Sequence, residues 1–593
     1  LATLYAHPDV IIAVADDGPR VHRASAPELK VRLHEGTDWL GVEGGVALSG
    51  GERVELQALV DALREGRRYV VLERGDVVTI DDDVYAALGA LAMFSRSGKR
   101  GLEVPSLAGA AVLDDVSVLA GADTQGWRLV HDRIEAAKDI DGVASVDVTA
   151  TLRPYQQEGL RFLRRLAALG TGGVLADDMG LGKTLTTTCL LVDRRTLGPQ
   201  IVVAPTSLGF HWAAEIKRFA PVLNPIVLSD LDGADARIAA IKSAGAGDVV
   251  ITSYGLVTRD VDKLGATSFA SLIVDEAQAA KNATTARARA LRKIDAAFKL
   301  ALTGTPLENH TGELWAIVDL VSPGLFGSYA QFKSRFADPI EKDHDDDRRR
   351  RLARALRPFL LRRKKADVAS DLPPKIERTV LLSPSPEERQ AYDRLRNAIL
   401  IELEERGVLD LETGKKPKRR EGEPVPTGQE ARVHILSALT RLRLCACHPA
   451  LVDDVLDPQT VPPGTKHEAL VAEMLELREQ GHHALVFSQF VKHLRLAERF
   501  LREAGLRTMI LTGDTPTDER RRLVERFQAG EADVFLISLK AGGFGLNLTR
   551  ASYVAHLDPW WNPAVENQAS DRAHRIGQTL PVTITRLVMD ETL

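Results

Sequence analysis

The chain has 593 residues, of which 44% are apolar and 27% are charged, a composition that excludes a wholly disordered or fibrous protein. No run approaches the roughly 18–20 apolar residues of a membrane-spanning helix, and the three cysteines exclude a disulfide scaffold and fit a reducing compartment. The net charge of −5 excludes a globally basic protein but leaves room for a local basic channel.

The first 145 residues alternate short apolar runs with turns and contain no catalytic pattern. Residues 69–80 alternate around Gly75 and Asp76 and predict a hairpin. Residues 81–95 predict a capped helix. We therefore predict a small accessory α+β domain over residues 1–145.

From about residue 150, short apolar strands alternate with helical stretches, which is typical of βαβ units around a parallel sheet. The expected strands are 174–176, 201–204, 249–251, 272–274 and 300–302, and later 484–487, 509–511, 534–537, 553–557 and 582–585. The sequence between about 326 and 460 is mostly charged and helical, and no such strand is expected there. We predict an α/β protein with two parallel-sheet lobes, 146–330 and 461–593, separated by a helical insertion and linker over 331–460.

A phosphate-binding loop is indicated at residues 179–184, Met-Gly-Leu-Gly-Lys-Thr, which follow an expected strand and open a helix. Glycines let backbone N–H groups wrap a phosphate, and the helix N-terminus adds positive potential. Lys183 would reach the outer phosphates and Thr184 would hold Mg²⁺. The strict motif spacing would place glycine at position 177, where this chain has Asp177. A Gly-Lys-Thr by itself is weak support.

The second motif of the expected nucleotide site is an acid pair, Asp275 and Glu276, which directly follows the apolar residues 271–274. Asp275 would hold Mg²⁺, and Glu276 would position and deprotonate the attacking water. Two acids that merely cap a strand are the alternative. Two expected strands separate this pair from Lys183, as a nucleotide-binding sheet requires, and the two motifs together predict an ATP and Mg²⁺ site.

With these motifs in view, the chain resembles the SWI/SNF family of superfamily 2 helicase-like ATPases from about residue 151 to its end. The matching segments are 152–159, 176–184, 204–208, 252–254, 302–309, 356–365, 372–375, 442–449, 486–489, 539–548, 558–563 and 568–578. The segments Leu-Arg-Pro-Phe-Leu-Leu-Arg-Arg-Lys-Lys, Leu-Pro-Pro-Lys and Leu-Arg-Leu-Cys-Ala-Cys-His-Pro are family hallmarks that strand-separating helicases lack. Asp178 stands where the family usually has glutamate.

The resemblance implies two RecA-like lobes and a set of nucleotide-site residues. Gln156 would read adenine, and the further nucleotide contacts would come from Gly180, Gly182, Lys183, Thr184, Gln278 and Gly545. The catalytic set would be Lys183, Asp275, Glu276, Arg572 and Arg575. The two arginines would act as fingers on the γ-phosphate from the second lobe. Because they are three residues apart, we expect them on one helix face; a solvated basic face is the alternative.

Small polar residues in three of these motifs suit contacts to DNA phosphates, which position a protein without reading bases. The candidates are Thr206, Ser207, Thr252, Ser538, Lys540 and Asn547. The run 348–365 holds ten Lys or Arg, some of which would face DNA while others balance the acids at 345–347. The basic loop 414–428 is either a nucleic-acid contact or a solvated loop. We expect at least one of Trp560 and Trp561 to pack in the core.

Cys445, Cys447 and His448 raise the question of zinc. Two sulfurs separated by one residue do not easily form half of a tetrahedral site, and the chain has no second cysteine pair. We therefore expect these residues to pack and expect no metal beyond Mg²⁺.

The combined interpretation is an ATP-dependent translocase on double-stranded DNA that remodels or displaces DNA-bound proteins, such as RNA polymerase or other complex subunits. The alternatives are a strand-separating DNA or RNA helicase and a nucleic-acid scaffold with a vestigial ATPase. Residues 38–90 are similar to a domain that precedes bacterial family members, so we expect a bacterial, cytoplasmic and nucleoid-associated protein without a membrane partner. The first residue is Leu1, and family members continue beyond the last motif, so we expect further residues at both ends.

Overall fold

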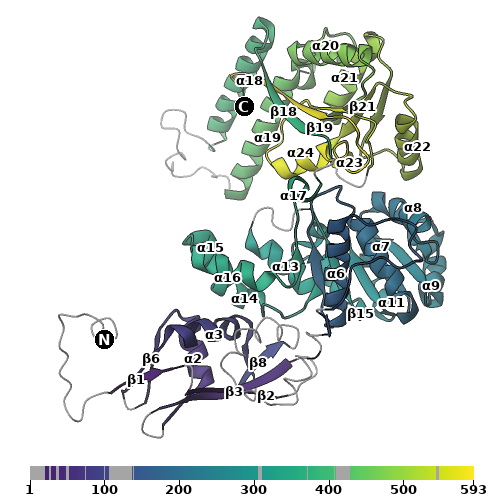
Figure 1. Ribbon diagram of the computed structural model, residues 1–593. Coiled ribbons are helices and arrows are strands. Elements are labelled where there is room, and N and C mark those ends of the chain that lie inside the picture. The colour runs from purple at the N-terminus through teal and green to yellow at the C-terminus, as the bar shows by residue number, and fades with distance from the viewer. Residues whose placement is uncertain are drawn as a thin grey trace. The chain divides into compact units, whose positions relative to one another are not determined.

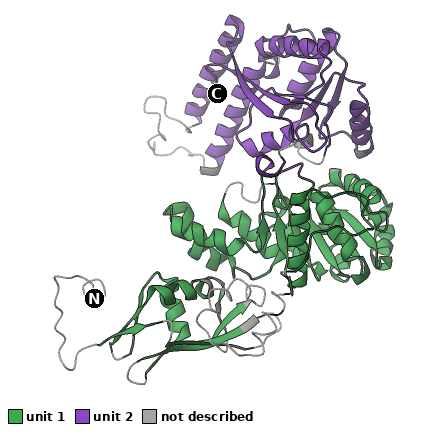
Figure 2. Cartoon of the chain, viewed as in Figure 1, with its two compact units in different colours: residues 1–178, 182–364 green, residues 179–181, 365–593 purple. Residues whose placement is uncertain are grey.

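The computed structural model describes residues 20–25, 28–34, 39–48, 52–73, 75–98, 101–105, 132, 136–137, 139–304, 310–369, 372–406, 408, 428–453, 455–542 and 546–592. The chain forms two compact units (Figure 2). The first comprises residues 1–178 and 182–364, and the second comprises residues 179–181 and 365–593. Among the described residues, no helix has both the length and the apolar character to cross a bilayer.

The N-terminal part of the first unit is the expected α+β structure (Figure 1). Its elements are β1 (Val21–Ala24), β2 (Leu29–His34), β3 (Trp39–Ala47), β4 (Arg53–Glu55), α2 (Leu56–Arg64), β5 (Tyr69–Val71), β6 (Val77–Ile80), α3 (Asp82–Phe94), β7 (Arg96–Gly98) and β8 (Gly101–Pro105). One antiparallel sheet has the order β2-β3-β8-β7 with β4 on β3, and a smaller sheet has the order β1-β6-β5. The predicted hairpin is confirmed, because β5 and β6 pair antiparallel around Gly75, whose φ is +88°.

A seven-stranded parallel sheet forms the centre of the first unit, in the order β11-β12-β10-β14-β16-β9-β17. Its strands are β9 (Gly173–Leu175), β10 (Gln200–Ala204), β11 (Asn224–Val227), β12 (Asp248–Ser253), β14 (Ser271–Val274), β16 (Lys299–Leu302) and β17 (Leu360–Leu361). All five strands predicted for this lobe are confirmed. Their apolar residues are buried on both sides, which is why the sequence shows runs rather than alternation.

The helices around this sheet and after it are α6 (Pro154–Ala168), α7 (Lys183–Asp193), α8 (Gly209–Phe219), α9 (Gly233–Ser243), α10 (Tyr254–Arg259), α11 (Val261–Gly265), α12 (Ala286–Arg292), α13 (Thr311–Val321), α14 (Tyr329–Phe332), α15 (Asp338–Lys342) and α16 (Asp346–Leu356). The short strands β13 (Ser268–Phe269) and β15 (Asp295–Ala296) pair with each other. Helices α6, α7 and α8 pack side by side, and α13 packs on β9 and β16. These contacts hold the two helices that flank the phosphate loop, α6 and α7, against each other.

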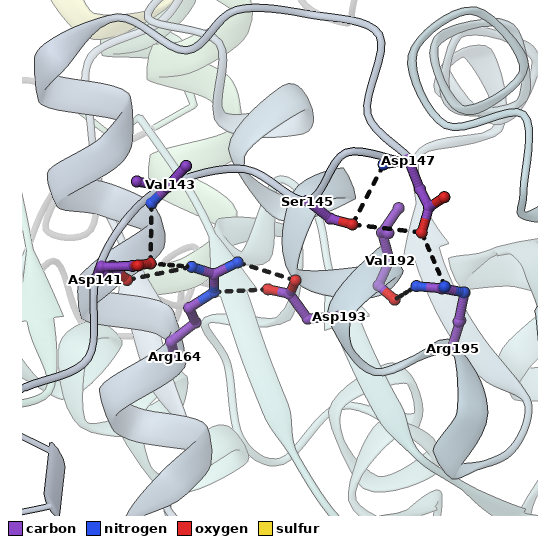
Figure 3. A network of polar contacts seen from close by, with 8 residues as sticks. All are labelled: Asp141, Val143, Ser145, Asp147, Arg164, Val192, Asp193 and Arg195. Atoms are coloured by element: carbon purple, nitrogen blue, oxygen red, sulfur yellow. Dashed lines mark hydrogen bonds and ion pairs between the residues drawn. The ribbon is translucent and has the colours of Figure 1, made fainter.

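Ion pairs attach the segment that leads into α6 to the first sheet's helices (Figure 3). Arg164 of α6 donates to both oxygens of Asp193 of α7, at 2.8 and 3.0 Å, and to Asp141 at 2.8 Å. Arg195 pairs with Asp147 at 2.8 Å. Two arginines, one in α6 and one just beyond the end of α7, therefore hold the segment 141–147 against the lobe.

The second unit contains a six-stranded parallel sheet in the order β18-β23-β22-β19-β21-β20. Its elements are α17 (Lys365–Val368), β18 (Lys375–Leu382), α18 (Pro386–Glu405), α19 (Gly428–Cys447), α20 (Thr465–Glu479), β19 (Ala484–Ser488), α21 (Val491–Glu503), β20 (Thr508–Leu511), α22 (Thr517–Gln528), β21 (Val534–Ser538), α23 (Leu539–Gly542), β22 (Tyr553–His556), α24 (Pro563–Ser570) and β23 (Val582–Met589). The five strands predicted here are confirmed. Leu485 and Phe487 of β19 join one buried cluster while Ala484 and Val486 join another, so both faces of the sheet are covered.

The expectation that residues 326–460 contain no strand was wrong. β17 is a two-residue edge strand, Leu360–Leu361, that pairs with β9. β18 pairs with β23 over eight residues, from Lys375 to Leu382. Both are edge strands, where one side meets solvent and charged residues are tolerated, so β18 lacks the apolar run that marks a central strand.

Candidate nucleotide site

The phosphate loop lies between β9 and the start of α7, as the sequence predicted. Gly180 and Gly182 have φ of +81° and +80°, the left-handed region that favours glycine. A Cβ on Gly182 would lie 2.4 Å from Nε2 of Gln156, so a side chain there would push the end of Gln156 aside. Lys183 is the first residue of α7, and Thr184 follows it half-buried. The backbone N–H groups of the first helical turn are therefore available to an anion.

The side chain of Lys183 is hydrogen-bonded to residues just before the phosphate loop. Its Nζ donates to the carbonyl oxygen of Asp177 at 2.6 Å and to that of Asp178 at 3.4 Å. Burial lowers the pKa of Lys183, while the acids Glu276, Asp177 and Asp275 act in the opposite direction. The lysine ammonium and the acid pair after β14 are thus close enough to influence each other electrostatically.

Asp177, which departs from the strict motif, has a structural partner that the sequence analysis missed. Arg363 donates from Nε to Oδ1 at 3.0 Å and from Nη2 to Oδ2 at 2.5 Å, and both side chains are about nine-tenths buried or more. Arg363 also binds the carbonyl oxygen of Tyr155 and lies over its ring. Its amide and carbonyl bind Asp177 and Asp178 as well. A family hallmark segment therefore supports the base of the phosphate loop.

Gln156 lies in the first turn of α6 and is 3% exposed. Its Oε1 accepts the backbone N–H of Arg153 at 3.0 Å, which caps the helix, and its Nε2 faces Gly182. The structure thus brings Gln156, Gly182 and Lys183 together, three residues that the sequence assigned to one site.

The acid pair stands at the carboxyl end of β14, where one aromatic residue binds the Asp275 side chain and another binds the backbone of both acids. Nε1 of Trp212 donates to Oδ2 of Asp275 at 2.8 Å, and the Glu276 N–H donates to Oδ1 at 2.8 Å. The Tyr254 hydroxyl donates to the carbonyl oxygens of Asp275 at 2.6 Å and of Glu276 at 3.2 Å. Burial, with the two nearby acids, raises the pKa of Tyr254 well above its usual range, so it stays a donor.

Glu276 has a strained backbone and a connection to the next strand. Its φ of +50° is uncommon for any residue other than glycine and costs of order 1–3 kcal/mol. Its Oε2 accepts from Nε2 of Gln278 at 2.7 Å, and Oε1 of Gln278 accepts from the Thr303 hydroxyl at 2.8 Å. This chain links the acid pair to the end of β16, where the segment 302–309 begins; residues 305–309 lie outside the described residues.

The candidate DNA contacts of the first lobe lie at the same sheet edge. Ala204, Ser253 and Val274 end adjacent strands, and the register pairs Ala204 with Ser253. Thr206 is exposed just beyond β10, and Thr252 is buried with a hydroxyl that has no hydrogen-bonding partner among the described residues. For Ser207 the backbone alone is described.

The second unit carries the remaining candidates. Ser538 ends β21 and is buried, and Asn547 is exposed. Lys540 lies in α23, but its side chain is outside the description, as is the whole of Gly545. The roles of these residues stay predictions.

The expectation of one helix face for Arg572 and Arg575 was wrong. α24 ends at Ser570, and both arginines lie in the turns that follow. Backbone carbonyls after α24 accept hydrogen bonds from outside the helix and not from a further helical turn. The Arg572 carbonyl accepts from the Leu548 N–H at 3.0 Å, and the Ala573 carbonyl accepts from Nε2 of Gln578 at 3.1 Å. Nη1 of Arg575 donates to the Leu546 carbonyl at 3.3 Å. These bonds join segments 539–548 and 568–578.

Neither tryptophan of the Asp-Pro-Trp-Trp segment is buried, contrary to the expectation. Trp560 is 36% exposed and Trp561 is 66% exposed, and the guanidinium of Arg443 lies 5.2 and 5.5 Å from their ring centroids. The basic run behaves as expected at its start, where three successive arginines pair with the three acids before them. Loop 414–428 lies outside the described residues except at Gly428.

We predict that Gly182→Ala weakens ATP binding by about tenfold or more. The left-handed backbone costs a residue with a Cβ about 1–2 kcal/mol, the added atom would displace Gln156, and 1.4 kcal/mol corresponds to a factor of ten. Gly170→Ala is the matched control, because Gly170 has φ of +69° but open space around its Cβ position. Equal affinity in the two variants, measured by nucleotide titration, would contradict the site.

A phosphate loop after β9, an acid pair after β14 of the same parallel sheet and a second α/β unit define the chain as a helicase-like ATPase. It belongs to the SNF2-related, or SWI/SNF, family of these enzymes: the SNF2-related domain matches residues 155–451, and the helicase conserved C-terminal domain matches residues 465–577. The family resemblance inferred from the motifs is thereby confirmed, and ATP is the nucleotide that this family uses.

Among its relatives, YwqA of Bacillus subtilis, named as a candidate ATP-dependent helicase/translocase, is 34% identical over 94% of this chain and 60% of its own length. The human SWI/SNF-related matrix-associated actin-dependent regulator of chromatin subfamily A member 1 is 36% identical over 74% of this chain and 42% of its own. The chain therefore spans about half the length of these relatives. The Sulfolobus solfataricus SWI2/SNF2 ATPase core in complex with dsDNA is 32% identical, with a TM-score of 0.37 over 75% of this chain and 89% of that one.

Proposed function

We propose that the chain is an ATP-dependent translocase on double-stranded DNA that remodels or displaces DNA-bound proteins. The observation that carries this proposal is the place of the family hallmark 356–365. It supplies an edge strand to the nucleotide sheet, and it supplies Arg363 to the base of the phosphate loop. A segment that strand-separating helicases lack is thus built into the nucleotide site.

In the proposed reaction, the loop around Gly180 and Gly182 and the start of α7 bind the ATP phosphates, and Gln156 binds adenine. Lys183 turns its ammonium to the outer phosphates. Thr184 and Asp275 would hold Mg²⁺, which supplies positive charge to the phosphate oxygens when bound. The glycine backbone, the adjacent helix N-terminus and the acid pair support this fit.

Glu276 orients and deprotonates the attacking water, and Gln278 holds its carboxylate. The Tyr254 hydroxyl binds the carbonyl of Glu276, whose backbone is strained, and Gln278 binds its carboxylate, and these bonds support a preset position for the base. Arg572 and Arg575 would stabilise the charge that develops on the γ-phosphate. We propose that the hydrogen bond between Gln278 and Thr303 couples the position of the acid pair to the segment after β16.

Duplex DNA is the proposed substrate, so it should stimulate ATP hydrolysis more than single strands or duplex RNA. The chain should displace the third strand of a triplex in an ATP-dependent manner and leave a forked duplex paired. DNA binding should fall steeply with salt and show no base preference, because phosphate contacts dominate. Lys183→Ala serves as the ATP-deficient control for triplex displacement. Efficient fork unwinding, or a stronger response to RNA, would favour the helicase alternatives.

The proposal also names the DNA-bound proteins on which the chain acts. We propose bacterial, cytoplasmic DNA-bound complexes such as RNA polymerase as the obstacles on which the chain acts, supported by the similarity to YwqA along nearly the whole of this chain. Release of a protein roadblock from duplex DNA, compared between wild type and Lys183→Ala, tests it directly.

A further inference from the structure

Three side chains that can bind a metal ion meet in the interior of the second unit. Cys447 is the last residue of α19, His493 lies in the first turn of α21, and Asp558 follows β22. One ligand atom from each lies within 4.8 Å of the other two. Nδ1 of His493 is 3.6 Å from Oδ1 of Asp558. The three residues come from distant parts of the sequence, and the fold brings them together.

The cluster is buried and its polar atoms are not saturated. The exposed fractions are 2% for Cys447, 0% for His493 and 4% for Asp558. Oδ2 of Asp558 accepts the Gln489 N–H at 3.2 Å. Among the described residues, neither Oδ1 of Asp558 nor either ring nitrogen of His493 forms a hydrogen bond, and Nδ1 and Oδ1 meet only at the 3.6 Å of an ion pair with protonated His493. A buried polar atom without a partner costs about 1–3 kcal/mol, and Nε2 of His493 has neither a hydrogen bond nor an ion pair among the described residues, so the cluster leaves room for a further ligand.

We propose that Cys447, His493 and Asp558 bind one Zn²⁺ ion. Thiolate sulfur, imidazole nitrogen and carboxylate oxygen are the three ligand types of protein zinc sites. Zinc–ligand distances of about 2.0–2.3 Å place tetrahedral ligands roughly 3.3–3.8 Å apart. The separation of His493 and Asp558 already lies in that range, and small side-chain rotations would bring Cys447 to it.

A second buried histidine, His467, lies beside His493. The ring of His467 lies edge-on to that of His493, with centroids 5.1 Å apart, and its nitrogens also have no hydrogen-bonding partner among the described residues. His467 is therefore the candidate for the fourth ligand after a rotation of its ring. The resulting site would be closed, which is typical of structural zinc rather than catalytic zinc.

This set differs from the Cys445, Cys447 and His448 group that the sequence suggested and rejected. His448 is used as a cap: its Nδ1 accepts the Ala450 N–H at 3.1 Å, and its Nε2 lies 3.1 Å from the Pro462 carbonyl. Cys445 packs in the cluster between α18 and α19. The expectation of packing holds for these two. It also holds for Cys447, which packs in a buried cluster with Leu496 and Phe500 and in addition lies close to His493 and Asp558.

A bound ion would join the end of α19 to the segment that carries the exposed tryptophans. One turn before Cys447, Arg443 donates to the Pro559 carbonyl at 2.7 Å and lies over Trp560 and Trp561. Asp558 opens the same segment. The zinc would therefore fix the position of these tryptophans relative to α19, which is a stabilising role and not a part of ATP hydrolysis.

Metal titration of the full chain tests the proposal without any variant. Protein stripped of metal and free of nucleotide is titrated with Co²⁺, which reports thiolate and tetrahedral coordination by its absorption. We expect one ion per chain, a thiolate-to-cobalt charge-transfer band, displacement of cobalt by Zn²⁺ and a higher thermal unfolding midpoint with zinc. Adventitious binding to surface histidines or to the acids of the nucleotide site would produce no thiolate band.

Variants then assign the ligands. Cys447→Ser should remove the charge-transfer band, and Asp558→Asn should weaken zinc binding by about tenfold or more, the loss that even an outer-shell change can cause. Cys445→Ser, two residues away on the same helix and equally buried, should retain both properties. The proposal is wrong if wild type shows no thiolate band at one equivalent of cobalt, or if Cys445→Ser loses the band while Cys447→Ser keeps it. If Cys447→Ser does not fold, the wild-type spectrum alone decides.

Discussion

Replacing Glu276 by glutamine is expected to lower ATP turnover by about 10²–10⁴-fold, the usual contribution of a general base, while ATP binding persists. The change removes the proton acceptor and keeps the shape of the side chain. The Tyr254 hydroxyl bonds to the backbone carbonyls, so the φ of +50° should be retained in the variant. Steady-state hydrolysis with saturating duplex DNA and binding of a fluorescent ATP analogue measure the two quantities.

A matched control separates this effect from the loss of any buried carboxylate. Asp260 is 9% exposed and pairs with Arg237 at 2.9 Å, also in the first unit. Asp260→Asn should lower stability but leave turnover within a few-fold of wild type. Near-normal hydrolysis in Glu276→Gln, or an equal loss in Asp260→Asn, would remove Glu276 from the role of the base.

The second large effect concerns stability. Arg363→Ala is expected to reduce the free energy of unfolding of the first unit by about 3–5 kcal/mol, because it leaves the Asp177 carboxylate buried without its partner. The pair is bidentate, with exposed fractions of 10% and 4%, so water cannot replace the guanidinium easily. Urea unfolding followed by a probe in the first unit, together with ATP affinity, measures the loss and its consequence for the phosphate loop.

Two further variants make this result specific. Arg350 pairs with Asp347 at 2.6 Å, but both side chains are about three-quarters exposed, so Arg350→Ala should leave stability unchanged. Adding Asp177→Asn to Arg363→Ala should recover part of the loss, because the unpaired charge is gone. If Arg363→Ala is as stable as Arg350→Ala, the buried pair does not support the loop.

Local patterns were sufficient for much of this molecule. The central strands were predictable because parallel strands buried on both faces read as short apolar runs, as at 201–204 and 534–537. The phosphate loop was predictable because its glycines and Lys183 are adjacent in the chain, and the acid pair because it directly follows a buried strand. Family membership followed from the order of such segments, each of which is contiguous.

Contacts between residues that are far apart in sequence could be learned only from the tertiary structure. No local pattern pairs Arg363 with Asp177, or places Trp212 on Asp275. β18 went unrecognised because an edge strand lacks the apolar run of a central one, and the turns at Arg572 and Arg575 depend on carbonyls bound by Leu548 and Gln578. The cluster of Cys447, His493 and Asp558 has the same origin. No sequence motif marks any of the three residues as a metal ligand, and they form a candidate metal site only because the fold brings three separate segments together in the interior.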